Sequence, residues 1–183
     1  EQSRQMFQMP AQYMFKDLPR VGQRDDYIAY TLEKMDEFNI EKAMIGVDED
    51  QYETQNEAVL KHPDRFIACY DANPNRGMEE VRKIRRLHET YNLKAVTAFP
   101  SGLCPQVSLA DKKWYPIFVT CIDLDLPFCP CVGVPGPRIP MEPQKVEHLD
   151  EICWFFPELR VVMRHGGEPW TDLAWKLMLK YPN

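Results

Sequence analysis

The sequence predicts an α/β protein built around a parallel β-sheet. Short, almost wholly apolar runs alternate with longer segments in which apolar residues recur at helical spacing. This alternation is typical of buried parallel strands that are joined by crossover helices. Each apolar run ends in small, polar or proline residues, as in HGGEP at 165–169. Because ligands gather at the carboxyl ends of parallel strands, we expect the functional site in these loops.

The predicted strands are five apolar runs, of which the first is KAMIGV. In chain order they cover residues 42–47, 65–74, 93–101, 126–133 and 159–167. The predicted helices carry apolar residues three or four positions apart, so that Ile28, Leu32 and Met35 share one face of the first helix. In chain order these helices cover residues 25–39, 78–92, 111–125, 143–157 and 170–182.

The arrangement of these strands is predicted to be part of a (β/α)8 TIM barrel. A doubly wound open sheet would carry a G-x-G-x-x-G turn after an early strand, and the sequence has neither that motif nor a Walker A loop. Such a barrel takes about 250 residues, whereas this chain has 183 residues. We therefore expect a single domain over residues 1–183 that holds about five of the eight strands. One strand is expected before residue 1 and two after residue 183.

The composition of the chain excludes several classes of binding partner. The net charge of -6 and a pI near 5.3 argue against nucleic-acid and anionic-membrane partners. No apolar run approaches the roughly 20 residues that cross a bilayer. Of the six cysteines, four lie in apolar segments, which favours reduced thiols and a cytoplasmic protein. An incomplete barrel leaves unpaired strand edges, which predicts either a homo-oligomer or a chain that needs the missing segments in order to fold.

Position along the chain singles out several side chains for a small-molecule substrate. His165 ends the fifth predicted strand, where it could act as an acid/base or a metal ligand, or only cap a turn. Arg138 lies in a loop rich in proline and glycine and could bind a substrate carboxylate. Asp71 and Trp170 are substrate-binding candidates, with turn formation and packing as their respective alternatives. Arg164 is expected on the opposite face of its strand from His165.

Five segments resemble, in the right order, the amidohydrolase-related family of the aminocarboxymuconate-semialdehyde decarboxylase type. The stretch VVMRHGGEPW at 161–170 is similar to the strand end of that family that carries an HGG or HxG motif. The other similar segments are MDEFNIEKAMIGV, NEAVLKHPDRFIACYDANPNRGMEEVRKI, YNLKAVTAFPS and KKWYPIFVTCIDLDLPF. The resemblance thus covers most of the chain.

This resemblance implies a TIM barrel that holds a divalent metal, often zinc, and that hydrolyses or decarboxylates small carboxylated substrates. It assigns His165 the role of a catalytic acid/base beside a metal-bound water. The His-x-His pair of the family's first strand occurs nowhere in this sequence. Where the family has a histidine on the fifth barrel strand, this chain has Cys131, which is either a substitute zinc ligand or a residue that only packs.

Two hypotheses follow. The first is an enzyme, a metal-dependent hydrolase or non-oxidative decarboxylase that uses His165. The second is a catalytically impaired relative that serves as a structural or interaction subunit, and Cys131 is the residue that supports it.

Overall fold

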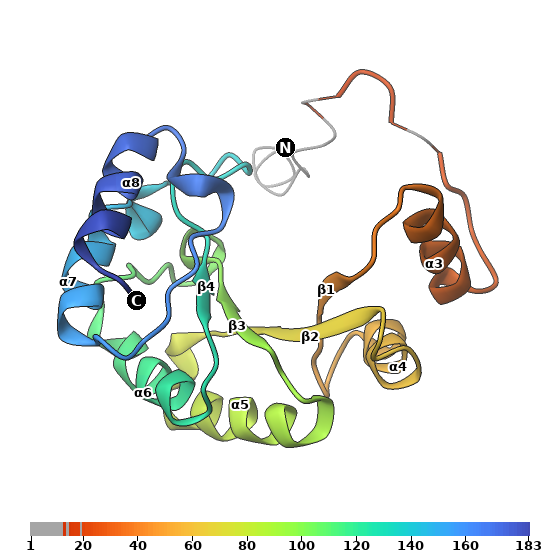
Figure 1. Cartoon of the computed structure of the whole chain (residues 1–183), viewed down its shortest axis with the longest axis horizontal. Helices are drawn as coiled ribbons and strands as arrows, with labels where there is room; N and C mark the ends of the chain where they lie inside the picture. Colours follow the sequence, from red (N-terminus) through yellow and green to blue (C-terminus); the bar gives the residue numbers. More distant parts are fainter. Residues whose placement is uncertain (1–12, 14, 19) are drawn as a thin grey trace.

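The computed structural model describes residues 13, 15–18 and 20–183. Its centre is a parallel sheet of four strands in the order β1-β2-β3-β4, and the helices form an arc around the outside (Figure 1). The strands are β1 Ala43–Gly46, β2 Phe66–Asp71, β3 Ala95–Ala98 and β4 Phe128–Pro130. Sequential order and parallel pairing are the arrangement predicted for successive β/α units.

The helices follow the sequence prediction closely, with one addition. In chain order they are α3 Tyr27–Glu37, α4 Glu53–Lys61, α5 Met78–Tyr91, α6 Tyr115–Asp123, α7 His148–Phe155 and α8 Thr171–Lys180. Helix α4 is absent from the prediction because it buries only Ala58 and Val59. Two neighbouring apolar residues give no helical repeat. None of the helices described is both long and apolar enough to span a bilayer.

The fifth predicted strand is present only in part. The chain from Arg160 to Arg164 runs parallel to β4, but its pairing consists of two isolated bridges, Phe128↔Val161 and Cys131↔Arg164. Backbone hydrogen bonds flank a gap, from Val162 N to Phe128 O at 2.9 Å and from Arg164 N to Pro130 O at 2.9 Å. Between them Pro130 has no N–H to donate, which removes one bond of the ladder. The prediction of a continuous strand at 159–167 is therefore wrong.

The outer face of the sheet packs against the helices through large side chains. Phe128 of β4 lies 5.5 Å from Trp114 and 4.9 Å from Phe118, measured between ring centroids, and all three are fully buried. Burial of each such ring contributes about 2–3 kcal/mol to folding. This aromatic cluster anchors α6 against β4 and fixes the strand whose carboxyl end leads into Cys131.

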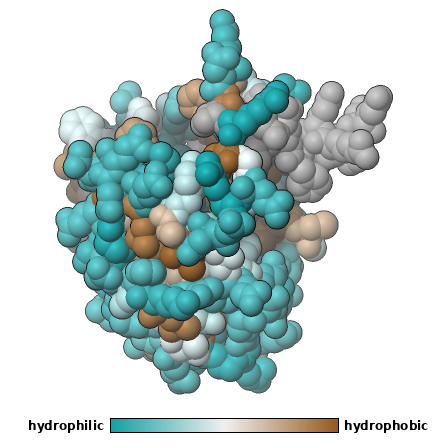
Figure 2. Space-filling view, turned by 90° about the vertical axis from the view of Figure 1, so that its right-hand side faces the viewer, coloured by the Kyte–Doolittle hydropathy of each residue, from teal (hydrophilic) through white to brown (hydrophobic). Residues whose placement is uncertain are grey.

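The inner face of the sheet carries small or polar side chains and is less covered. Cys69, Ala95 and Cys129 form a small buried cluster there, whereas Met44 of β1 is 50% exposed and Val162 is 52% exposed. From the side of α3 and β1, the surface is mostly hydrophilic with separate hydrophobic patches (Figure 2). The inner face is therefore open enough to line a cavity.

Candidate active site

A large cavity of about 1590 Å³ lies over the inner face of the sheet and the carboxyl ends of its strands. Strand register explains which side chains reach it. Asp71 pairs with Thr97, and Thr97 pairs with Cys129, so these three side chains point to the same face. Cys131 lies two residues beyond Cys129 and therefore points the same way. All four line the cavity.

His165 and Cys131 lie next to each other at this cavity, although they are far apart in the sequence. The Cys131 Sγ lies 3.5 Å from the His165 Nε2. The imidazole is exposed, whereas Cys131 is 5% exposed. Burial raises the pKa of the Cys131 thiol, and the nearby Arg164 charge only partly opposes this. A protonated thiol is a weak nucleophile and a weak metal ligand. The pair can exchange a proton and presents one exposed acid/base to the cavity.

Arg164 also lines this cavity, contrary to the prediction that it lies on the opposite face from His165. The bridge to Cys131 aligns Arg164 with the inner row of side chains. Strand alternation stops at the next residue, because His165 adopts a left-handed φ of 63°. That turn, rather than strand alternation, directs the imidazole, and so two successive side chains face the same cavity.

Asp71 occupies the predicted position at the end of β2 and lines the cavity. Its Oδ1 accepts a hydrogen bond of 3.0 Å from the Thr97 hydroxyl. Asp71 is exposed at the cavity, but the protein atoms around its carboxyl partly desolvate it and raise its pKa, while the Thr97 hydrogen bond and the Arg164 charge act in the opposite direction. The Asp71 carboxyl can thus serve as an acid/base in addition to the His165 imidazole, or as a hydrogen-bonding group, on the inner face of the sheet.

The two other predicted substrate contacts lie outside the cavity lining. Arg138 is exposed, and its guanidinium carbon lies 5.5 Å from the ring centroid of Tyr13. Trp170 is half-buried immediately before α8 and packs against the main hydrophobic core. Direct substrate contact by Arg138 and Trp170 stays a prediction.

Gln144 is a cavity residue that sequence patterns do not single out. Its side chain is 1% exposed, and its Nε2 donates to the Gly133 carbonyl at 3.1 Å. Its Oε1 accepts no hydrogen bond from any residue that the structure describes, although it is buried. Buried polar atoms are normally satisfied, so this oxygen lacks the hydrogen-bond donor that its burial calls for. A single glutamine in a proline-rich loop offers no sequence signal for this role.

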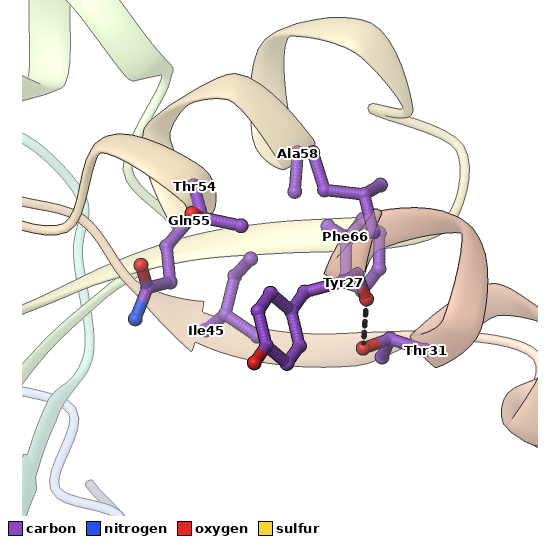
Figure 3. A pocket seen from close by; sticks show the side chains of 8 residues that line it. Tyr27, Thr31, Ile45, Thr54, Gln55, Ala58 and Phe66 are labelled. Atoms are coloured by element: carbon purple, nitrogen blue, oxygen red, sulfur yellow. Dashed lines mark hydrogen bonds between the residues drawn. The ribbon is translucent and has the colours of Figure 1, made fainter. Parts of the chain in front are cut away.

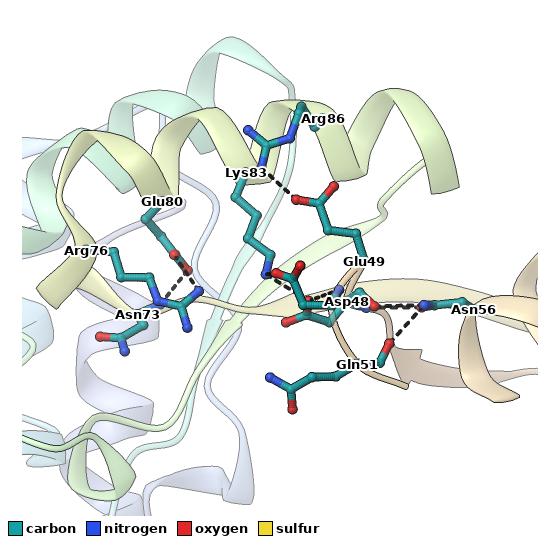
Figure 4. A network of polar contacts seen from close by, with 10 residues as sticks. Asp48, Glu49, Gln51, Asn56, Asn73, Arg76, Glu80, Lys83 and Arg86 are labelled. Atoms are coloured by element: carbon teal, nitrogen blue, oxygen red, sulfur yellow. Dashed lines mark hydrogen bonds and ion pairs between the residues drawn. The ribbon is translucent and has the colours of Figure 1, made fainter. Parts of the chain in front are cut away.

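A buried ion-pair network supports the loop after β1, at one side of the cavity (Figure 4). Lys83 of α5 donates to Asp48 Oδ1 at 2.8 Å and to Asp50 Oδ2 at 2.7 Å. The Asn56 side chain in α4 donates to the Asp48 carbonyl at 2.7 Å and accepts from the Asp48 N–H at 3.1 Å. These contacts fix the loop to two helices, so they shape the cavity wall.

A smaller cavity of about 340 Å³ lies between α3, β1 and α4 (Figure 3). Its lining is mainly apolar, with Ile45, Ala58 and Phe66 on one side and Tyr27 on the other. None of its lining residues is a histidine, a cysteine or a carboxylate. It therefore lacks the groups for metal binding or acid/base catalysis that the larger cavity has.

Metal binding is the least supported part of the expected site. Within residues 13, 15–18 and 20–183, no three histidine, cysteine, aspartate or glutamate side chains form a possible metal site. Cys131 and His165 supply two neighbouring donors, whereas catalytic zinc sites use three protein ligands. The described side chains therefore do not by themselves fit a bound metal.

Comparison with known proteins assigns this chain to a family. A family model described as amidohydrolase matches residues 3–183, and the chain belongs to that family. No curated protein matches the chain. An uncharacterized TIM-barrel protein from Bordetella bronchiseptica is similar in structure, with a TM-score of 0.71 and 20% identity over 85% of this chain and 57% of that chain.

Two solved decarboxylases are also similar. A 2,6-dihydroxybenzoate decarboxylase complexed with 2,6-dihydroxybenzoate has a TM-score of 0.63 and 16% identity, over 86% of this chain and 60% of that chain. The 5-carboxyvanillate decarboxylase of Novosphingobium aromaticivorans, complexed with manganese and 4-hydroxy-3-methoxy-5-nitrobenzoic acid, has a TM-score of 0.62 and 19% identity, over 97% of this chain and 58% of that chain. The chain thus spans less than two thirds of these proteins, and its fold is part of a TIM barrel.

Proposed function

We propose that this protein is an amidohydrolase-family hydrolase or non-oxidative decarboxylase of a small carboxylated substrate, with His165 as its acid/base. The observation that carries the proposal is the exposed His165 imidazole, which faces a cavity at the strand ends beside Cys131 and Arg164. The names of the two similar decarboxylases support the substrate class. Hydrolysis stays within the proposal because an imidazole serves either reaction.

The proton chemistry of a decarboxylation fits these side chains. Cleavage of the C–C bond releases CO₂ and leaves the electron pair on carbon. A protonated His165 imidazole then donates its proton to that carbon, forming a C–H bond. The Cys131 thiol, 3.5 Å from Nε2, holds the ring at the cavity. General acid catalysis of this kind contributes about 10²- to 10⁴-fold to the rate.

We include a divalent metal in the proposal because of the family, and not because of a ligand set among the described side chains. Manganese is bound in the 5-carboxyvanillate decarboxylase structure. For this protein we propose zinc, because a cysteine at position 131 is a softer ligand than manganese prefers. Zinc would need protein ligands other than Cys131 and His165, since these two do not complete a site.

The alternative function is that of a catalytically impaired relative that acts as a structural or interaction subunit. One observation favours it: Cys131 stands at the family's histidine position with a thiol whose pKa is raised by burial. A protonated thiol holds a metal poorly, so metal chemistry would be weakened.

We also propose a homo-oligomer in a reducing, cytoplasmic setting. Strand β1 has no strand partner on the side away from β2 among the residues described, so this edge favours association unless a further barrel strand covers it. All six cysteines are free and five of them are buried, which suits a reducing compartment.

The test is CO₂ release by the purified full-length protein from 2,6-dihydroxybenzoate and 5-carboxyvanillate, with and without added zinc or manganese. We expect release from at least one of them, and a loss of about 100-fold or more in kcat for His165→Asn, because asparagine does not titrate. His62→Asn is the matched control. His62 packs edge-on against Phe66 and lies outside the cavity lining.

Full activity in His165→Asn would remove the acid/base role. If CO₂ release and hydrolysis of the corresponding methyl esters are both absent under every metal condition, the proposed reaction is contradicted for these substrates and the impaired relative is favoured.

A further inference from the structure

Arg164 brings a cation into the cavity beside the proposed acid/base. Its backbone N–H donates to the Pro130 carbonyl at 2.9 Å, and its bridge to Cys131 orients the side chain toward the inner face. We propose that Arg164 binds the carboxylate of the substrate. This inference rests on the proposed function, which it deepens by assigning the anchor of the substrate class.

The Arg164 guanidinium has no anionic partner in the described part of the chain. It influences Asp71 and Cys131 through its charge alone, without a hydrogen bond to either. Arg160, four residues earlier, instead pairs with Asp125 at 2.8 Å on the surface. Arg164 is exposed at the cavity and makes no ion pair there with the residues that the structure describes, so its N–H donors are free to bind a ligand anion. The cavity therefore favours an anionic ligand at Arg164.

Chemistry and position both favour a carboxylate as that anion. A guanidinium presents parallel N–H donors that match the two oxygens of a carboxylate. Arg164 immediately precedes His165, and both side chains line the cavity. A carboxylate on Arg164 thus brings the carbon that carries it close to the imidazole. Arg138 lacks this placement, because it stacks on the lining residue Tyr13 without itself lining the cavity.

Binding of simple probes to the full-length protein tests the anchor without any turnover. Benzoate and benzamide have nearly the same shape, but only benzoate is charged. By isothermal titration calorimetry we expect the wild type to bind benzoate more tightly than benzamide. Arg164→Gln should lower the affinity for benzoate about 10- to 100-fold, as expected for the loss of charged hydrogen bonds. The affinity for benzamide should stay unchanged.

Two further variants sharpen the result. Arg164→Lys keeps the charge but loses the planar fork, so its benzoate affinity should fall between those of the wild type and Arg164→Gln. Arg160→Gln removes an arginine that pairs with Asp125 on the surface, away from the cavity lining, and should leave both affinities unchanged. Retained benzamide binding shows that each variant keeps a folded cavity.

The anchor is overturned if the wild type does not prefer benzoate, or if Arg164→Gln leaves that preference intact. It is also overturned if Arg160→Gln abolishes the preference. These outcomes are separate from the proposed reaction. If the Arg164 pattern holds and no CO₂ or ester product forms, the anchor stands and the reaction fails. If turnover depends on His165 but the benzoate affinity does not depend on Arg164, only the proposed role of Arg164 is contradicted.

Discussion

Single residues with left-handed backbone angles decide how the loops around the cavity meet. Gly133, just after β4, has a φ of +100° and hydrogen-bonds through its N–H to the Gln144 carbonyl at 2.9 Å. A Cβ at this position would lie 2.4 Å from the Glu168 carbonyl oxygen. The close approach joins the Gln144 loop to the segment that follows His165.

Gly133→Ala should therefore lower the free energy of unfolding by about 3 kcal/mol, from backbone strain and from the clash with Glu168 together. Urea denaturation monitored by circular dichroism measures the change. Gly22→Ala is the matched control, because Gly22 also has a positive φ of +71°, but a Cβ there would meet no described atom within 4 Å. We expect it to cost only about 1 kcal/mol. Equal losses for the two variants would contradict the close-approach explanation.

At the scale of elements, the buried network around Lys83 connects α5 to the loop after β1. The Lys83 side chain is 5% exposed and that of Asp48 is 9% exposed, so each needs the other as a partner. Burial lowers the pKa of Lys83, but hydrogen bonds to Asp48 and Asp50 outweigh it and the pKa is raised overall. Lys83 is therefore charged at neutral pH.

Lys83→Met should destabilise the protein by about 3 kcal/mol or more, because Asp48 is left as a buried charge without its partner. Thermal unfolding at pH 7 measures the effect. Lys61→Met is the control, since Lys61 pairs with Glu57 on the exposed surface of α4 and its loss should leave the unfolding temperature nearly unchanged. If both variants lose the same stability, the loop does not depend on the network.

At the scale of the whole molecule, buried thiols make the free energy of unfolding depend on pH in the alkaline range. Burial raises the pKa of Cys121 to about 12 and of Cys69 and Cys153 to about 11, from 9.0. Above pH 9 the unfolded chain loses these protons while the folded protein keeps them. The contribution of each thiol is therefore fully present below pH 9 and is lost as pH rises toward the folded pKa.

Stability measured by urea denaturation in the presence of a reductant should fall between pH 9 and 11. For Cys121→Ala the slope in this range should be shallower, by up to about 1.4 kcal/mol per pH unit. Cys104→Ala is the control, because Cys104 is exposed and its removal should leave the slope unchanged. An identical slope in the wild type and Cys121→Ala would contradict the assignment.

Much of the fold and part of the candidate site follow from local patterns. The four strands and five of the helices arise from apolar runs and helical spacing that each segment carries by itself. Asp71, Cys131 and His165 are predicted at strand ends and do line one cavity. Helix α4 and Gln144 escape prediction because neither has a periodic pattern or a motif around it.

By itself, the sequence determined a parallel β/α fold, a family resemblance across most of the chain, and the expectation of a histidine at the carboxyl end of an apolar run, because strand alternation and helical repeats are properties of short segments. Only the tertiary structure decided which side chains share the cavity. A left-handed turn at His165 placed Arg164 beside it, and Pro130 interrupted the neighbouring ladder. Such directions depend on backbone angles and on pairing with distant residues, which no local pattern encodes.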